Sequence, residues 1–246
     1  MAMDTINAVC SWIREQVVKA GAKGIVLGLS GGIDSAVVAA LARRALGPDV
    51  LGLLLPCHSH RQDTEDALTV AGHLGLETVT IDLTPVFDLL LTLLPSAGAV
   101  VTANLKPRLR MMALYHFAGL KKYLVAGTGN KSEISVGYFT KHGDGGADLL
   151  PLGDMLKSEV WAMAAQLGLP EAVINKPPSA GLLPGQTDEG ELNISYAELD
   201  QALKAIADRC NETLSPGLRQ RVEQLMKISE HKRAAIPVFK LDPASR

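Results

Sequence analysis

Short apolar segments alternate with longer segments of helical periodicity over the first 135 residues of the chain. The apolar segments have the length of strands, and the segments between them place apolar residues on one face of a helix. We predict strands at 24–29, 50–55, 77–82 and 123–127 and helices at 5–20, 35–46, 64–74 and 99–117. Strands that are apolar on both faces and separated by helices are typical of a parallel sheet covered on both sides. The pattern therefore predicts a doubly wound α/β fold.

The regular alternation ends near residue 135. Glycine and aspartate are frequent at 137–151, a helix is predicted at 157–167, and prolines and glycines interrupt 177–190. Irregular segments of that length often serve as lids. Two helices are expected between Tyr196 and about Lys232, the second beginning near Pro216. We expect one domain over residues 1–246, with a nucleotide-binding α/β core at about 20–175, a mobile loop at about 176–190 and a C-terminal helical extension at about 191–246.

The segment after the first predicted strand carries the clearest chemical signal. A strand, a glycine-rich turn and a helix start together form a cradle for phosphate, because the free amides of the helix start point at an incoming anion. Gly31 and Gly32 allow positive φ and leave no Cβ in the way, while Ser30 and Ser35 add hydroxyl donors. We expect this segment to bind the phosphates of ATP through Gly28, Leu29, Ser30, Gly31, Gly32, Ile33, Asp34 and Ser35.

Asp34 lies in the same loop and would repel a phosphate, but a carboxylate there can hold Mg²⁺, which bridges carboxylate and phosphate oxygens. The dinucleotide fingerprint would need glycine at Ser30, and no Walker A sequence occurs in the chain. Ligands bind beyond the carboxyl ends of the strands in doubly wound sheets. The glycine loop and the segments 56–63 and 127–132 all follow predicted strands, so they should converge on one site.

Composition and charge exclude several classes of protein. Hydrophobic residues make up 47% of the 246 residues, yet no apolar run approaches the roughly 18 residues of a membrane helix. The formal net charge is −2, which argues against broad nucleic-acid binding. Asp4, Arg14 and Glu15 make the first segment unlike a signal or transit peptide. We expect a cytoplasmic protein with neither membrane nor nucleic-acid partners.

The three cysteines, Cys10, Cys57 and Cys210, are far apart and form no Cys-x-x-Cys pair. They indicate neither a disulfide framework nor a structural zinc site. Cys57, His58 and His60 lie close together, but a metal site of this kind normally needs a second ligand cluster, and none is evident. We interpret 57–60 as a loop beside the site.

Six motifs occur in an order that resembles the NAD synthetase family, and together they run over most of the chain. The narrowest of them is Thr-Lys-x-Gly-Asp-Gly-Gly-Ala-Asp, beginning at Thr140. The first motif, Ser-Gly-Gly-x-Asp-Ser, is shared by many enzymes that split ATP into AMP and pyrophosphate. The motifs occupy residues 30–35, 106–111, 127–133, 137–148, 176–182 and 186–189.

The resemblance implies a fold of the adenine nucleotide alpha hydrolase type and a two-step amidation. ATP would adenylylate the nicotinate carboxylate of deamido-NAD and release pyrophosphate, and ammonia would then displace AMP to give NAD. A carboxylate has no good leaving group, so it must be activated first, and the departing pyrophosphate needs donors, cations and metal around it. The implied cofactor is Mg²⁺, held by Asp34 and Glu133, with ATP as co-substrate.

The resemblance also implies roles for residues outside the glycine loop. Thr128, Lys157 and Ser179 would bind ATP, and Arg108, Lys141, Asp148, His231 and Lys232 would surround deamido-NAD. We expect Asp34, Lys157 and Asp144 to be catalytic, with Asp144 orienting ammonia or taking a proton as the amide forms. Local structure offers plainer roles: Asp144 in a turn, Glu133 in a helix cap and His231-Lys232 at a helix end.

The nitrogen donor, the oligomeric state and two alternative functions remain to be considered. No segment of the 246 residues could house a glutaminase domain, so we expect free ammonia, or ammonia from a separate protein, as nitrogen donor. The resemblance suggests a homodimer. Two other classes stay open: another ATP pyrophosphatase-loop enzyme that amidates or thiolates, such as GMP synthetase, and an ATP-binding sensor without catalysis.

Overall fold

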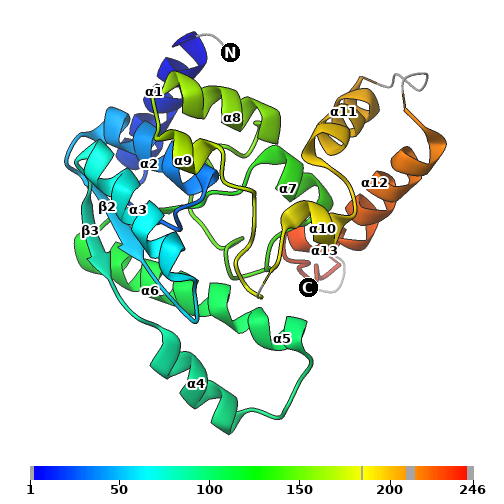
Figure 1. The fold of residues 1–246 in the computed structure, drawn as a ribbon, viewed down its shortest axis with the longest axis horizontal. Helices are drawn as coiled ribbons and strands as arrows, with labels where there is room; N and C mark the ends of the chain where they lie inside the picture. The colour runs from blue at the N-terminus through cyan, green and yellow to red at the C-terminus, as the bar shows by residue number, and fades with distance from the viewer. Residues whose placement is uncertain (1–2, 184, 209–213, 243–246) are drawn as a thin grey trace.

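The structure is a computed structural model that describes residues 3–183, 185–208 and 214–242. A four-stranded parallel sheet forms its centre, in the order β3-β2-β1-β4 (Figure 1). Its strands are β1 (Ile25–Gly28), β2 (Val50–Leu54), β3 (Glu77–Thr80) and β4 (Leu124–Ala126). The chain winds outward from β1 to β3 and then returns to place β4 on the other side of β1. The predicted doubly wound α/β fold is thus confirmed, with its crevice at the carboxyl ends of β1 and β4.

The sheet is apolar on both faces at its centre, as the sequence predicts. Ile25 and Leu27 of β1 pack into one buried cluster, whereas Val26 between them packs into a second cluster on the opposite face. The prediction is wrong for β3, where Glu77 and Thr80 are exposed. This strand is the edge of the sheet and pairs only with β2. Fewer elements cover it, so polar residues are tolerated there.

Helices cover both faces of the sheet. The first cluster includes buried residues from α1, α2, α3, α8 and α9, and the second from α4 and α6. Those covering the first face are α1 (Met3–Lys19), α2 (Ile33–Leu46), α3 (Arg61–Leu74), α8 (Lys157–Gln166) and α9 (Glu171–Ile174). Those on the other side are α4 (Thr84–Leu93) and α6 (Leu105–Lys121), and α5 (Ala99–Ala103) packs against α6. These bounds agree with the predicted helices to within a few residues, with three exceptions, of which the first is the short helix α9, where no helix was predicted.

The predicted helix at 99–117 is two helices that meet at Asn104, and 84–93 forms a helix to which the sequence analysis assigned no element. Pro85 lies in the first turn of α4, where a missing amide costs nothing, so it starts this helix and does not break it. Only Phe87 of α4 is buried, because the helix stands away from the sheet (Figure 1).

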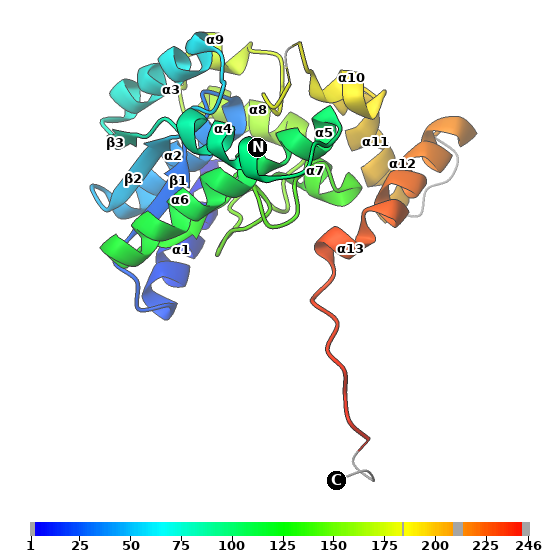
Figure 2. The same ribbon diagram turned by 90° about the horizontal axis from the view of Figure 1, so that it is seen from below.

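Residues from the second half of the chain form a third buried cluster beside the crevice, built around Leu156, Tyr196 and Val222. Its helices are α7 (Lys131–Val136), α10 (Asp188–Leu192), α11 (Tyr196–Ala207), α12 (Pro216–Ile228) and α13 (Glu230–Arg233). Pro216 begins α12 as predicted, and the Ser215 hydroxyl accepts a hydrogen bond from the Leu218 amide to cap it. Beyond α13 the chain leaves the body as an extended segment (Figure 2). Cys210 lies outside the described residues.

None of the helices that the structure describes combines the length and the hydropathy needed to span a membrane. The apolar stretch at 84–93 is instead the ten-residue helix α4.

Candidate active site

The glycine-rich loop joins β1 to α2 as a tight turn held by its own serines. The Ser35 hydroxyl donates to the Gly32 carbonyl at 2.9 Å and lies 3.1 Å from the Ser30 hydroxyl, which accepts from the Gly32 amide at 3.2 Å. Gly31 has φ +79°, and a Cβ there would lie 2.4 Å from the Asp63 carbonyl oxygen. Gly32 also allows positive φ, but its φ in the structure is −90°. Only Gly31 therefore needs to be glycine for conformational reasons, and the turn presents the start of α2 to the crevice.

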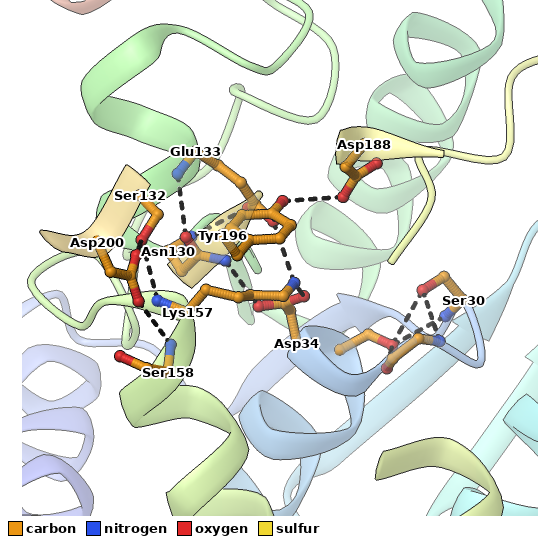
Figure 3. A network of polar contacts seen from close by, with 12 residues as sticks. Ser30, Asp34, Asn130, Ser132, Glu133, Lys157, Ser158, Asp188, Tyr196 and Asp200 are labelled. Atoms are coloured by element: carbon orange, nitrogen blue, oxygen red, sulfur yellow. Dashed lines mark hydrogen bonds and ion pairs between the residues drawn. The ribbon is translucent and has the colours of Figure 1, made fainter. Parts of the chain in front are cut away.

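The ammonium of Lys157 lies between two carboxylates at the crevice. It bonds Asp34 Oδ2 in α2 and lies 3.3 Å from Glu133 Oε1 in α7 (Figure 3). The Lys157 side chain is 1% exposed, against 18% for Asp34 and 15% for Glu133. Three residues far apart in sequence, each predicted to be functional, thus form one nearly buried cluster of charges.

Asn130 orients both carboxylates. Its side-chain amide donates to Asp34 Oδ1 at 2.9 Å, and its side-chain oxygen accepts from the Glu133 amide at 3.0 Å. The Glu133 carboxylate accepts in turn from the Asn130 amide at 3.2 Å, which completes a capping box at the start of α7. The local reading of Glu133 as a cap is therefore confirmed, and the same carboxylate also faces Lys157.

Helix α11 supports this cluster from the C-terminal extension. The Tyr196 hydroxyl lies 3.2 Å from Glu133 Oε1 and 2.9 Å from Asp188 Oδ2. The Asp200 carboxylate accepts from the Ser132 hydroxyl at 2.5 Å and from the Ser158 amide at 2.8 Å (Figure 3). Asp200 thereby ties the start of α7 to the start of α8, next to Glu133 and Lys157. The sequence analysis assigned no role to Tyr196, Asp188 or Asp200.

The cluster is electrostatically unusual. Burial raises the pKa of Glu133 to about 8, and the nearby Asp34 adds to this shift while Lys157 opposes it. Burial likewise raises the pKa of Asp188. Burial alone would lower the pKa of Lys157, but the carboxylates of Asp34 and Glu133 outweigh it and raise that pKa above its usual value. The lysine is therefore cationic, and the site holds more carboxylates than it has cations to pair them.

A cavity of about 480 Å³ extends from this cluster along the carboxyl ends of the strands. It is lined by residues that follow β1, β2 and β4, so the predicted convergence of these segments is confirmed. The predicted site residues along it are Gly28, Leu29, Ser30, Gly32, Ile33, Asp34, Ser35, Thr128, Glu133, Asp144, Lys157 and Ser179. Gly31, Arg108, Lys141, Asp148, His231 and Lys232 do not line it.

Asp144 reaches the cavity from the glycine-rich segment after α7. Its carboxylate accepts from the Thr140 amide at 2.9 Å, so its expected role in a turn is confirmed. Burial raises its pKa, and the hydrogen bonds from Thr140 and the charge of Lys232 oppose the shift. Asp144 thus combines a fixed orientation with an environment that favours proton uptake.

Four of the five residues expected around deamido-NAD gather outside the cavity, next to the segment that carries Asp144. Lys141 donates to the His231 carbonyl at 2.6 Å, Arg108 to the Lys141 carbonyl at 3.3 Å, and Lys232 to the Gly137 carbonyl at 2.7 Å. The fifth, Asp148, is bonded elsewhere: it accepts from the Tyr115 hydroxyl at 3.0 Å and from the Val125 amide at 2.8 Å. The tertiary fold therefore collects the predicted cations but places Asp148 against β4.

Two further basic residues line the cavity without having been predicted. Arg110 donates to the Leu55 carbonyl at 3.1 Å and to the Ser59 hydroxyl at 3.2 Å, and it anchors the 57–60 loop beside the cavity. Lys176 pairs with Asp63 and Asp66 of α3 at 2.8 and 2.5 Å, which holds the base of the 176–190 loop. Arg110 and Lys176 both lie within the motifs of the sequence analysis, but only the tertiary structure shows the groups that they bond.

Comparisons with known proteins show the family of this chain. A family model described as NAD synthase matches residues 5–236. An NH(3)-dependent NAD(+) synthetase of Archaeoglobus fulgidus is 47% identical over 239 residues, covering 96% of each chain. One of Carboxydothermus hydrogenoformans is 49% identical over 198 residues, which cover 78% of this chain and 82% of that one.

Solved structures give the same result. An NMN synthetase of Francisella tularensis matches with a TM-score of 0.90 and 36% identity, covering 97% of this chain and 98% of that one. An NH3-dependent NAD synthetase of Campylobacter jejuni matches with a TM-score of 0.86 and 33% identity, covering 98% of this chain and all of that one, 100%. The sequence and the fold together show that this chain belongs to the NAD synthase family.

Proposed function

We propose that the protein is an ammonia-dependent NAD synthetase that amidates deamido-NAD. ATP transfers its adenylyl group to the nicotinate carboxylate and pyrophosphate leaves; ammonia then attacks the acyl carbon, AMP leaves, and one proton is released. The observation that carries this proposal is that the glycine loop, the Lys157 cluster and the Asp144 turn all line one cavity. The printed names of the relatives support the choice of reaction.

The ATP side of the cavity supplies what pyrophosphate departure requires. The amides at the start of α2 and the hydroxyls of Ser30 and Thr128 can donate to phosphate oxygens. The hydroxyls of Ser35 and Ser179 would do so only if they exchanged their bonds to the Gly32 and Gln186 carbonyls. Lys157 adds a positive charge in a nearly buried place, where it acts more strongly than in water. Together these groups stabilise the negative charge that collects on pyrophosphate in the transition state.

Asp34 and Glu133 suit Mg²⁺, which usually takes one or two carboxylates together with substrate phosphates. Both carboxylates are mostly buried, oriented by Asn130 and short of positive charge. When bound there, the ion would neutralise phosphate charge during adenylyl transfer. Among the described residues no three His, Cys, Asp or Glu side chains form a ready-made metal group, so further ligands would come from ATP.

The amidation step falls to the other end of the cavity. Ammonia must be neutral to attack and must lose a proton as the amide forms, and Asp144 can orient it and accept that proton. The raised pKa of Asp144 fits proton uptake. Arg108, Lys141 and Lys232 gather beside the segment that carries Asp144 and supply cations that can bind the phosphates of a dinucleotide. Asp148 would act there only if its bonds to Tyr115 and Val125 were exchanged.

A second candidate is amidation of nicotinate mononucleotide. The match to the NMN synthetase of Francisella tularensis, with its TM-score of 0.90, favours it, and the chemistry at the carboxylate would be the same. The two substrates differ by the AMP half of the dinucleotide.

A coupled assay decides among these functions. Purified protein, Mg-ATP and either deamido-NAD or nicotinate mononucleotide are mixed with ammonium or with glutamine, and the amidated product and pyrophosphate are measured. We expect NAD with ammonium and little with glutamine. Faster amidation of the mononucleotide would establish the second candidate. Pyrophosphate release without either product would indicate another ATP pyrophosphatase-loop enzyme, and ATP binding alone would indicate a sensor.

Asp34→Ala provides the matching test of the residues. It removes one of the proposed metal carboxylates, so pyrophosphate release should fall to background. Near-normal turnover at saturating Mg²⁺ would exclude Asp34 as a metal ligand.

We also propose that the protein is a homodimer. Apolar side chains are exposed along α4, α5 and the middle and end of α6, and these helices form the lower part of the molecule in Figure 1. Leu89, Leu93, Val101 and Leu120 are 60–72% exposed. A surface of this kind is typical of a subunit interface. Sedimentation velocity should give twice the 26.1 kDa of one chain, and Leu89→Asp should shift it toward the monomer.

A further inference from the structure

The last helix that the structure describes, α13, lies against the segment that follows α7. The Lys232 ammonium donates to the Gly137 carbonyl at 2.7 Å and to the Phe139 carbonyl at 2.8 Å. It also lies 5.4 Å from the centre of the Phe139 ring. A Cβ on Gly137 would lie 2.2 Å from Ser229 Cβ, so the two parts of the chain are in close contact. Lys232 thus fixes the backbone immediately before Thr140.

Phe139 contacts the Asp144 turn at two places. It precedes Thr140, whose amide donates to the Asp144 carboxylate at 2.9 Å. Its ring also packs against Gly145, where a Cβ would lie 2.5 Å from Phe139 Cδ2. The Gly145 amide donates to the Thr140 carbonyl at 3.3 Å, which closes the turn. A shift of Phe139 would therefore move both the donor that orients Asp144 and the residue that follows it.

Lys232 also acts on Asp144 through its charge. Burial raises the pKa of Asp144, and the hydrogen bonds from Thr140 and the charge of Lys232 oppose this shift. Burial lowers the pKa of Lys232, and the charge of Asp144 opposes that shift in turn. Burial also lowers the pKa of Arg110 in α6, which the charges of Cys57 and Asp144 oppose. Cations of α6 and α13 thus act on the same carboxylate, and both favour its ionised form.

The hydrogen bonds of Lys232 limit what else it can bind. An ammonium has three hydrogens, and two of those on Lys232 go to backbone carbonyls. A substrate phosphate could therefore receive only the third while the 137–139 segment keeps its position. Asp144 lines the cavity, whereas Lys232 does not. Arg108 and Lys141 remain as cations for the phosphates of a dinucleotide.

We propose that Lys232 is a positioning residue for amide formation, which holds the Asp144 turn in place and does not contact the substrate. The inference rests on the proposed function only for the role of Asp144 as proton acceptor. It gives the C-terminal extension a second task in the site, because α11 supports the Lys157 cluster and α13 supports the Asp144 turn. Loss of Lys232 should slow the attack of ammonia and leave adenylyl transfer almost unchanged.

The test measures the two steps separately on the full chain. Mg-ATP and saturating deamido-NAD are added first without ammonia, and the released pyrophosphate measures adenylyl transfer. Ammonium is then added, and the rate of NAD formation measures amidation. In Lys232→Met amidation should fall about ten- to a hundredfold, because a displacement of about 1 Å at a reacting group has an effect of that size. Pyrophosphate release and the KM for deamido-NAD should stay within about threefold of the parent.

Two further variants control for folding and for the loss of charge. A misfolded protein would lose pyrophosphate release as well, so the ratio of the two rates reports only on folded enzyme. Lys227→Met is the matched control, because Lys227 is an exposed lysine of the neighbouring helix α12, and it should leave both steps unchanged. Lys232→Arg keeps the charge and the donors, so it should amidate faster than Lys232→Met.

The pH dependence of amidation, measured at a constant concentration of free ammonia, gives the second readout. Asp144 accepts a proton only when it is ionised, so the rate falls on the acid side as this carboxylate becomes protonated. Without the charge of Lys232 the pKa of Asp144 rises further. The acid limb should therefore move to higher pH in Lys232→Met and stay in place in Lys232→Arg. A contact that only stabilises the fold would lower the rate without moving this limb.

The outcomes separate this inference from the proposed function. A KM for deamido-NAD raised about tenfold or more in Lys232→Met, with amidation unchanged at saturation, would make Lys232 a substrate ligand and overturn the inference. Equal losses in both steps, or an acid limb that does not move, would overturn it as well. All three results leave the proposed function intact as long as the parent forms NAD. A parent that forms no NAD would overturn the proposed function itself.

Discussion

Replacing Lys157 by methionine should destabilise the ligand-free protein strongly. Methionine keeps most of the buried stem but removes the ammonium that lies between Asp34 and Glu133. Removing one partner of a buried ion pair typically costs 3–5 kcal/mol, because the other charge stays buried without compensation. In a chain of this size each kcal/mol lowers the melting temperature by about 2–4 °C, so we expect a loss of roughly 6–20 °C.

Urea unfolding in EDTA at pH 7 measures the free energy directly. Lys131→Met is the matched control, because Lys131 pairs with Asp154 at 2.9 Å while the two side chains are 42% and 96% exposed. An exposed pair contributes about 0–1 kcal/mol, so this variant should unfold almost like the parent.

A double variant tests whether an unpaired buried charge causes the loss of stability in Lys157→Met. Adding Asp34→Asn to Lys157→Met removes the charge left behind, so it should recover a large part of the lost stability. The reasoning would be refuted if Lys157→Met cost no more than Lys131→Met, because the carboxylates would then carry no net charge in the folded protein.

Three further results should follow from the same site. Asp144→Asn should impair amide formation more than pyrophosphate release, measured in one assay, and equal losses would refute its role as proton acceptor. Folding raises the pKa of Glu133 from 4.5 to about 8, so protonation of this side chain favours the folded state. Its contribution to the free energy of unfolding is complete below pH 4.5 and is lost as the pH rises through 8. In EDTA the parent should therefore lose about 2 kcal/mol more than Glu133→Gln between pH 6 and 8, and parallel curves would contradict the shift. Lys176→Met removes two ion pairs at the base of the 176–190 loop, so thermolysin, which does not cleave at lysine, should cleave that loop faster than in the parent. An unchanged rate of cleavage would show that other contacts hold the loop.

The sequence by itself was sufficient wherever the signal is local. Alternating Ile25, Val26 and Leu27 must bury both faces of a strand, because successive side chains point in opposite directions. Asn130 and Glu133 are three residues apart, so their capping box depends only on the first turn of one helix. The same holds for Pro216, whose fixed φ suits the first position of α12.

Other features were hidden from the sequence because they depend on tertiary neighbours. Pro85 suggests an interruption, yet it lies in the first turn of α4, where its missing amide has no helical partner to lose. The polar exposure of β3 follows from its place at the sheet edge, which strand order decides. Gly32 could adopt positive φ, but the turn uses only Gly31 for it.

The active site shows most clearly which features are visible in the sequence and which depend on the tertiary structure. Residue types were enough to single out Asp34, because a carboxylate in a phosphate loop is chemically recognisable in sequence, whereas Glu133 and Lys157 were assigned through the resemblance to the NAD synthetase family. Their mutual distances were not visible, since Asp34 and Lys157 are separated by 123 positions and meet only when α8 packs against α2. The imbalance of charge around Lys157, with Tyr196 and Asp188 beside it, depends on burial. Burial is a property of the packed chain, and only the tertiary structure decides it.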